Sequence, residues 1–149
     1  MRLEGDTMNL KYLEKTLTGL VLDLKPAPEP PADYVPFESM DFDRSEKDNS
    51  KWIELITDYL TTAKTFEIHC WNEEPKWIEL VLQYGELKDD DWKYGKIITG
   101  KVTPQFIKML LGQNKPSDTE IYNKMTPFFN VFLDDNFQSC HYGTENYYK

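Results

Sequence analysis

Two mirrored dipeptides carry residue types that proteins use for metal binding and nucleophilic catalysis. His69 precedes Cys70, and Cys140 precedes His141. If each pair lies on a strand, its two side chains point to opposite faces of the sheet, so each pair offers one ligand to a given side. Two ligands fall short of the four that a structural zinc site takes, and no C-x-x-C or H-x₃-H spacing supplies the others. We therefore expect no metal and no cofactor, and two cysteines that are reduced and face the core.

The same residues would also allow a cysteine–histidine nucleophile, pairing Cys70 with His141 or Cys140 with His69. Such a pair needs hydrogen-bonding contact and donors that stabilise an oxyanion. No glycine-rich turn adjoins either cysteine, and the chain has no phosphate-binding loop, nucleophile elbow, H-E-x-x-H motif or dinucleotide fingerprint. We expect no catalytic residues, although a small enzyme whose site combines His69, Cys140 and His141 with nearby carboxylates is an alternative.

Two aspartate runs are candidates for binding a hard cation or for acid–base chemistry. Asp89, Asp90 and Asp91 are consecutive but lack the Asp-x-Asp-x-Asp-Gly spacing of a calcium loop. Asp134 and Asp135 fall at the tip of a predicted hairpin, where aspartate is common because it suits turns. Neither run predicts a metal site.

Negative charge is concentrated in the middle of the chain. The formal net charge is -9, and residues 23–91 carry 18 acidic and 7 basic side chains, which is a net charge of −11. Such a field repels phosphate backbones, so direct nucleic-acid binding through a broad basic surface is disfavoured. It favours a basic partner.

Aromatic residues make up 14% of the chain, and several of them adjoin these acids. Trp71 precedes Asn-Glu-Glu, while Trp92 and Tyr94 follow the three aspartates. Exposed tryptophan and tyrosine anchor many protein interfaces, and surrounding carboxylates steer a cationic partner. Residues 73–94 are therefore predicted to hold a contact surface; alternatively, Trp92 begins a strand and turns inward. The predicted partner-binding residues are Trp71, Glu73, Glu74, Asp89, Asp90, Asp91, Trp92 and Tyr94.

In size, acidity, aromatic content and lack of a catalytic set, the chain resembles the small cytoplasmic immunity proteins that neutralise bacterial toxins. No specific residue carries this resemblance. It implies a non-enzymatic inhibitor that occludes a basic protein, for which a nuclease toxin is one candidate. A third interpretation is an accessory module that a larger complex holds through the N-terminal segment.

The elements that must position these residues are predicted from periodicity. The pentapeptide KWIEL occurs at residues 51–55 and 76–80, and a looser copy, QFIKM, at residues 105–109. Each copy follows a helix-start signal and places an aromatic and aliphatic residues at helical spacing, so three helices are predicted to present a similar face to one sheet. Alternation predicts strands at residues 66–71 and about 92–102, and a hairpin at residues 128–142.

We expect one α+β domain spanning residues 1–149, with a mostly antiparallel sheet of about four strands and several helices packed on one face. A proline-rich, acidic, irregular segment at residues 26–49 is predicted to join an N-terminal helix at residues 8–25 to this core, packing through Tyr34, Phe37, Met40 and Phe42. Ser117 and Glu120 have capping-box spacing before a short fourth helix.

The chain has no apolar stretch near the roughly 20 residues that span a bilayer, and its N-terminus lacks the pattern of a secretory signal. With two cysteines and no Asn-x-Ser/Thr acceptor, the chain is predicted to be cytoplasmic, without a membrane partner.

Overall fold

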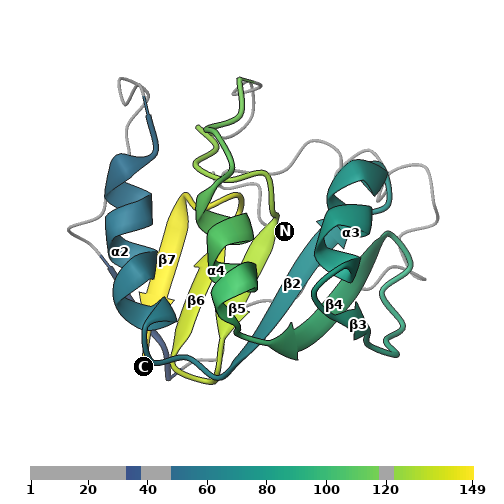
Figure 1. Ribbon diagram of the computed structural model, residues 1–149, viewed down its shortest axis with the longest axis horizontal. Coiled ribbons are helices and arrows are strands. Elements are labelled where there is room, and N and C mark those ends of the chain that lie inside the picture. Colours follow the sequence, from purple (N-terminus) through teal and green to yellow (C-terminus); the bar gives the residue numbers. More distant parts are fainter. Residues whose placement is uncertain (1–32, 38–47, 118–122) are drawn as a thin grey trace.

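A seven-stranded antiparallel sheet dominates the computed structural model, which describes residues 33–37, 48–117 and 123–149 (Figure 1). The strand order is β1-β7-β6-β5-β2-β4-β3, and every neighbouring pair is antiparallel. The strands are β1 (Val35–Pro36), β2 (Thr65–Trp71), β3 (Glu86–Leu87), β4 (Gly95–Lys101), β5 (Asn130–Leu133), β6 (Phe137–Cys140) and β7 (Glu145–Tyr148).

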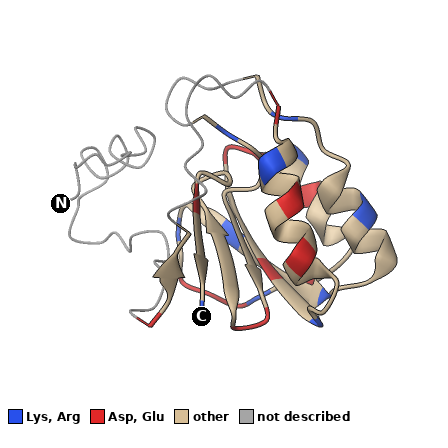
Figure 2. Cartoon of the chain, turned by 90° about the vertical axis from the view of Figure 1, so that its left-hand side faces the viewer, with Lys and Arg blue, Asp and Glu red and all other residues tan. Residues whose placement is uncertain are grey.

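Three short helices accompany this sheet: α2 (Ser50–Leu60), α3 (Pro75–Leu82) and α4 (Pro104–Leu111). They lie in front of the strands in Figure 1, and Figure 2 shows the helix layer beside the sheet. The prediction of about four strands with several helices packed on one face is therefore wrong, because the described fold is a seven-stranded sheet with only three short helices. The periodicity missed β1 and β3 because two residues carry no alternation, and it missed β7 because ENYY is short and half polar.

The repeated pentapeptide is explained by packing. Ile56, Val81 and Leu110 occupy equivalent positions in the three helices, and all three are buried in one core with the sheet. The aromatic positions differ more: Phe106 stacks on Phe66 of β2 with ring centroids 3.9 Å apart, whereas Trp77 is half-buried. The repeat thus serves the contact between helices and sheet.

The helix starts follow the sequence only in part. Thr103 caps α4, since its hydroxyl accepts a hydrogen bond from the backbone N–H of Phe106 at 3.1 Å. At α2, Asn49 occupies the N-cap position and Ser50 is the first helical residue. The Asp48 carboxylate accepts instead from the Ser50 N–H and hydroxyl.

The predicted strand at residues 66–71 and the predicted hairpin are confirmed as β2 and as β5–β6. Asp134, at the hairpin turn, has a φ of 51°. Its carboxylate accepts hydrogen bonds from the Lys64 N–H at 3.0 Å and the Thr65 N–H at 2.9 Å. Asp134 therefore ties the hairpin to the start of β2.

The predicted N-terminal helix lies outside the described residues, and so do Met40, Phe42 and the start of the predicted fourth helix. The described end of that predicted helix, residues 123–125, is not helical. Within the segment predicted to be irregular, β1 pairs with β7. Phe37 packs against Tyr59, Phe137 and Tyr148, with ring centroids 4.6–6.3 Å away, which confirms that this residue contacts the body of the protein.

A second, smaller core lies away from the helices. It consists of Trp71, Trp92, Ile97, Phe129 and Tyr142, with Tyr94 partly buried against it. Ile97 belongs to the face of β4 opposite Ile98, which packs in the main core, because successive strand residues point to opposite faces. The residues of this second core adjoin the two acidic segments, residues 72–74 and 88–94, that form part of the candidate site.

Candidate functional site

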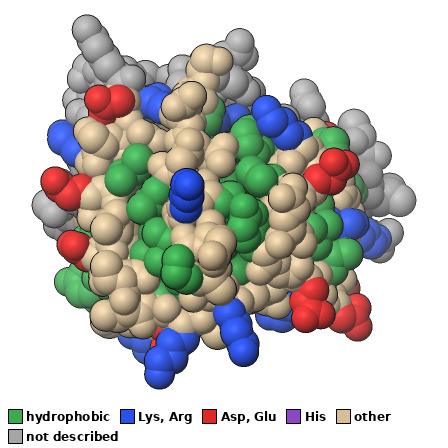
Figure 3. Space-filling model, viewed as in Figure 1, with side chains coloured by type: hydrophobic (Ala, Val, Ile, Leu, Met, Phe, Trp, Pro, Cys, Tyr) green, Lys and Arg blue, Asp and Glu red, His purple; other side chains and the backbone are tan. Residues whose placement is uncertain are grey.

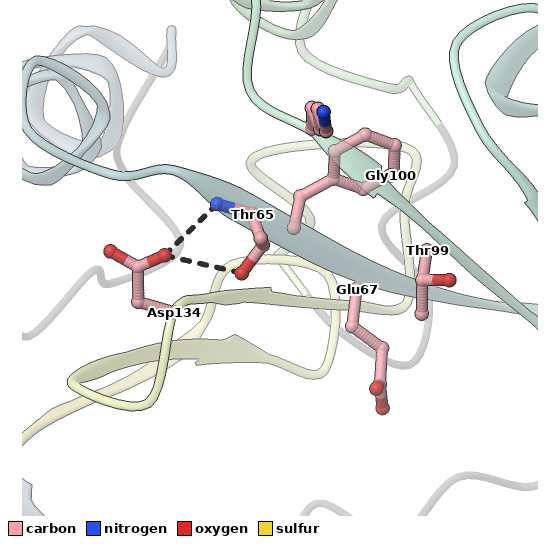
Figure 4. A pocket seen from close by; sticks show the side chains of 7 residues that line it. Thr65, Glu67, Thr99, Gly100 and Asp134 are labelled. Carbon is pink, nitrogen blue, oxygen red and sulfur yellow. Dashed lines mark hydrogen bonds between the residues drawn. The ribbon is translucent and has the colours of Figure 1, made fainter.

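A shallow pocket of about 300 Å³ lies where β2, β4 and the β5–β6 turn meet (Figure 4). Glu67 and Thr99 are direct cross-strand partners, so their side chains leave the sheet on the same side. The lining residues are Thr65, Phe66, Glu67, Thr99, Gly100, Lys101 and Asp134. The two carboxylates at this pocket already accept hydrogen bonds from the protein. Asp134 accepts from Thr65 and Lys64, and Glu67 is bonded to His69. The pocket therefore offers no unengaged acid.

Glu67 belongs to a hydrogen-bonded network that extends into the protein interior. Its Oε2 lies 2.7 Å from Nε2 of His69, and its Oε1 accepts from the Lys88 ammonium at 3.2 Å. Nδ1 of His69 lies 3.0 Å from Nδ2 of Asn130, whose Oδ1 accepts from the backbone N–H of His141 at 3.2 Å. The hydrogen bond from His69 is the largest influence on Glu67 and holds the pKa of its carboxyl below the ordinary 4.5.

Hydrogen-bonding rules assign the tautomer of His69. A backbone N–H can only donate, so the Asn130 atom facing His141 is the amide oxygen and the atom facing His69 is the NH₂ group. Nδ1 of His69 therefore accepts, and Nε2 carries the proton that it donates to Glu67. Both ring nitrogens are engaged and the residue is 0% exposed. In this arrangement His69 cannot take a proton from a substrate.

Neither cysteine forms a disulfide, and both are buried. Cys70 packs in the main core, where burial and, to a smaller extent, the charge of Glu74 raise the pKa of its thiol far above the ordinary range. Cys140 is 2% exposed. The Cys–His pairs considered from the sequence are thus not presented to solvent. Within the described ranges, no group of three or more His, Cys, Asp or Glu residues is placed to hold a metal ion.

His141 lies in a turn with unusual backbone geometry. His141, Tyr142 and Gly143 have φ values of 53°, 61° and 86° in succession. Positive φ is uncommon for residues other than glycine and costs of the order of 1–3 kcal/mol for a bulky side chain. Nδ1 of His141 lies 3.0 Å from Oε2 of Glu145. The Tyr142 hydroxyl donates to Oε2 of Glu74 at 3.0 Å.

The predicted contact residues occupy two connected segments around the second core. Trp71 and Trp92 contact each other, with ring centroids 5.0 Å apart, and both are buried, at 0% and 4% exposure. The expectation that these indoles are exposed anchors is therefore wrong, because they pack inward against Phe129, Ile97 and Tyr142. The alternative interpretation, in which Trp92 turns inward, is confirmed. Tyr94 is half-buried at the edge of the same cluster.

Asn72 joins the two acidic segments. Its backbone N–H donates to the carbonyl of Tyr94 at 2.9 Å, and its side-chain amide donates to the carbonyl of Lys93 at 3.0 Å. Glu73 and Glu74 follow Asn72 directly, and Glu73 is exposed while Glu74 is half-buried. Asp89, Asp90 and Asp91, in the other segment, are all exposed.

The acidic loop is also ordered by its own side chains. Oδ1 of Asp90 accepts from the backbone N–H of Trp92 at 2.8 Å. Together, residues 72–74 and 88–94 carry five acidic and two basic side chains, which is a local net charge of −3. Lys88 and Lys93 are the two basic residues, and Lys88 pairs with Glu67.

Charge elsewhere on the described surface is mixed. Figure 2 shows acidic and basic residues interspersed along the helices and strands. On the face in Figure 3, apolar side chains are exposed across the central area, and both acidic and basic side chains lie around the rim. In these two views, acidic residues do not form one continuous negative face.

His69 was singled out from the sequence, but its partners Glu67 and Asn130 were not. Glu67 and His69 are two apart on a predicted strand, so the alternation could have placed them on one face. Asn130 is a polar residue inside the apolar run FFNVFL, which is a weaker signal of a buried hydrogen bond. Nothing in the local sequence indicated that Asn72 clamps the two acidic segments or that Tyr142 bonds Glu74.

No protein-family model matches this sequence, and no curated protein or solved structure is similar enough to give a match. Among the described residues, no helix is both long enough and apolar enough to cross a membrane.

Proposed function

We propose that this chain is a non-enzymatic binding protein that docks a basic partner protein through the carboxylates of residues 73–74 and 89–91. The observation that carries the proposal is the clamp made by Asn72, which holds these two acidic segments together. Four of these acidic side chains, Glu73, Asp89, Asp90 and Asp91, are exposed on ordered segments and offer a cationic surface a preorganised partner, which lowers the entropy cost of association.

The buried tryptophans have a different role from the one that the sequence suggested. Trp71 and Trp92 pack in the second core, where they support the two acidic segments, and they do not insert into the partner. The contact is then mainly electrostatic, so it is expected to associate quickly and to weaken with salt. An inhibitor that occludes a basic toxin, in the manner of the immunity proteins that the chain resembles in profile, is the form of this function that we favour.

Two further observations support a binding role over catalysis. The nitrogens of His69 are both engaged in internal hydrogen bonds, and both cysteines are buried. We place the protein in the cytoplasm, where reduced cysteines are the norm.

The test is affinity capture from the native host with three baits of matched design. The first is the wild type, the second carries Asp89→Asn, Asp90→Asn and Asp91→Asn, and the third carries Glu54→Gln, Asp58→Asn and Asp135→Asn. The two variants have the same net charge, and the amide at position 90 keeps the oxygen that accepts from Trp92. Glu54 and Asp58 are exposed on α2, and Asp135 is 90% exposed.

The proposal predicts that a basic protein is retained by the wild type and by the third bait, is lost from the second, and elutes as salt is raised. Equal retention by all three baits, or retention of an acidic or neutral protein only, would exclude these segments as the contact surface.

A further inference from the structure

The hydrogen bonds around His69 connect a buried titratable ring to the strained turn at residues 141–143. Nδ1 of His69 accepts from the Asn130 amide, and the oxygen of the same amide accepts from the His141 N–H. This bond holds one end of a turn in which two consecutive residues other than glycine have positive φ. The conformation of the turn is therefore linked to the protonation state of the ring.

A second proton on His69 cannot be added without rearrangement. It would occupy Nδ1 and face the NH₂ group of Asn130, so that two donors would meet. Turning the Asn130 amide over restores an acceptor to His69, but it then directs the NH₂ group at the N–H of His141. In that orientation the amide no longer accepts a hydrogen bond from the His141 N–H.

We propose that His69 and Asn130 form an acid-sensitive switch that loosens the turn at residues 141–143 and, through Tyr142, the Glu74 side of the contact surface. Tyr142 links the two because its hydroxyl donates to Glu74 while its ring packs in the second core. The consequence for partner binding rests on the function proposed above. The switch itself does not rest on that function, and its effect on the turn can be measured in the protein without a partner.

The surroundings of His69 are compatible with a charged ring once the amide has turned. The Glu67 carboxylate faces Nε2 from the same strand, and the Lys88 ammonium lies behind that carboxylate. From the neighbouring elements, Asn130 and the rings of Phe132 and Trp92 face the imidazole, with centroids 4.6 Å and 6.0 Å away for the two rings. Glu145 faces His141, not His69. Proton uptake by a fully buried ring requires the local openings that hydrogen exchange reports.

Nitrogen-detected NMR of the two histidine rings tests the switch, since the chain contains only two histidines. At neutral pH, His69 is expected to show the Nε2–H tautomer. As acid protonates it, the His141 amide is expected to lose about tenfold in protection from exchange, relative to intrinsic rates, because one hydrogen bond is lost. The Tyr142 amide, which donates to the Phe129 carbonyl, reports whether the loosening spreads.

Three variants separate this switch from its alternatives. His69→Gln keeps a donor for Glu67 but cannot titrate, so the acid response of the turn should disappear. His141→Asn removes the other histidine and suits the positive φ, so the response should remain. Asn130→Asp can accept from both His69 and His141 without turning over, so the His141 amide should stay protected in acid.

A response that survives His69→Gln, or that disappears in His141→Asn, would overturn the proposal, since it would assign the effect to another group. An Nδ1–H tautomer of His69 at neutral pH would overturn it as well. If Asn130→Asp does not fold, the two histidine variants still decide the matter, and either result leaves the partner-capture test unaffected.

Discussion

Ser139 shows how a single polar side chain in this core depends on its partner. Its hydroxyl accepts from the indole N–H of Trp52 at 2.8 Å, and the two residues are 0% and 1% exposed. Ser139→Ala leaves a buried donor without an acceptor and is expected to lower the free energy of unfolding by about 1–3 kcal/mol, measured by urea denaturation. In a Trp52→Phe background the same substitution should cost much less; an equal cost in both backgrounds would show that the hydrogen bond contributes little.

Gly143 is the residue most constrained by its own backbone. Its φ is 86°, and a Cβ at this position would lie 2.9 Å from both Met125 Cβ and Trp52 Nε1. Gly143→Ala is expected to destabilise the protein by about 2 kcal/mol or more, because left-handed strain adds to the steric overlap. Thermal and urea unfolding measure the cost. His141→Asn, in the same turn, is the control and should change stability by less than about 1 kcal/mol; if Gly143→Ala is equally mild, the turn is more adaptable than its geometry indicates.

At the scale of elements, Asp134 joins the β5–β6 hairpin to β2. Desolvation alone would raise the pKa of this carboxyl, but the N–H groups of Thr65 and Lys64 outweigh it and hold the pKa below the ordinary 3.8. A lowered folded-state pKa means that the charge stabilises the fold above the unfolded-state value and that this stability is lost as pH falls through the folded-state pKa.

Asp134→Asn is therefore expected to cost about 1 kcal/mol at neutral pH and nothing extra in acid, so the stability curves of variant and wild type should converge below about pH 4. Asp135→Asn is the matched control, since Asp135 is 90% exposed. Urea denaturation across pH 2–7 measures both. A constant difference at all pH values would mean that Asp134 acts through packing and not through its charge.

The same elements show what could be inferred from the sequence. Strand alternation identified β2, because Phe66, Ile68 and Cys70 face the helices while Glu67 and His69 face the other way. Strands of two residues and the polar β7 gave no such signal. The number of strands was therefore underestimated, although the three described helices and the hairpin were predicted.

The candidate site was harder to predict than the strands and helices, because it depends more on long-range contacts. The acidic segments and their adjacent tryptophans were visible in the sequence, but the inward packing of Trp71 and Trp92 depends on Phe129 and Tyr142, which are far along the chain. The His69–Asn130 hydrogen bond likewise requires the register of β2 against β5, and the two residues are 61 positions apart. Local periodicity contains no information on such pairings.

At the scale of the whole molecule, the proposed function depends on which of the negative charges attract the partner. The net charge is -9, yet acidic and basic residues are interspersed over much of the described surface (Figure 2). Docking at this surface requires that the carboxylates held by the Asn72 clamp contribute more to association than the same number of carboxylates elsewhere. Net charge alone would make every acidic residue nearly equivalent in long-range attraction.

Association kinetics with the captured partner test this claim most directly. Stopped-flow measurements at several salt concentrations would compare the wild type with the Asp89→Asn, Asp90→Asn, Asp91→Asn variant and with the equally charged Glu54→Gln, Asp58→Asn, Asp135→Asn variant. We expect an association rate about tenfold lower for the first variant at low salt, a difference that shrinks as salt is raised, and a much smaller change for the second. Equal slowing in both variants, or none in either, would contradict a contact surface at residues 73–74 and 89–91.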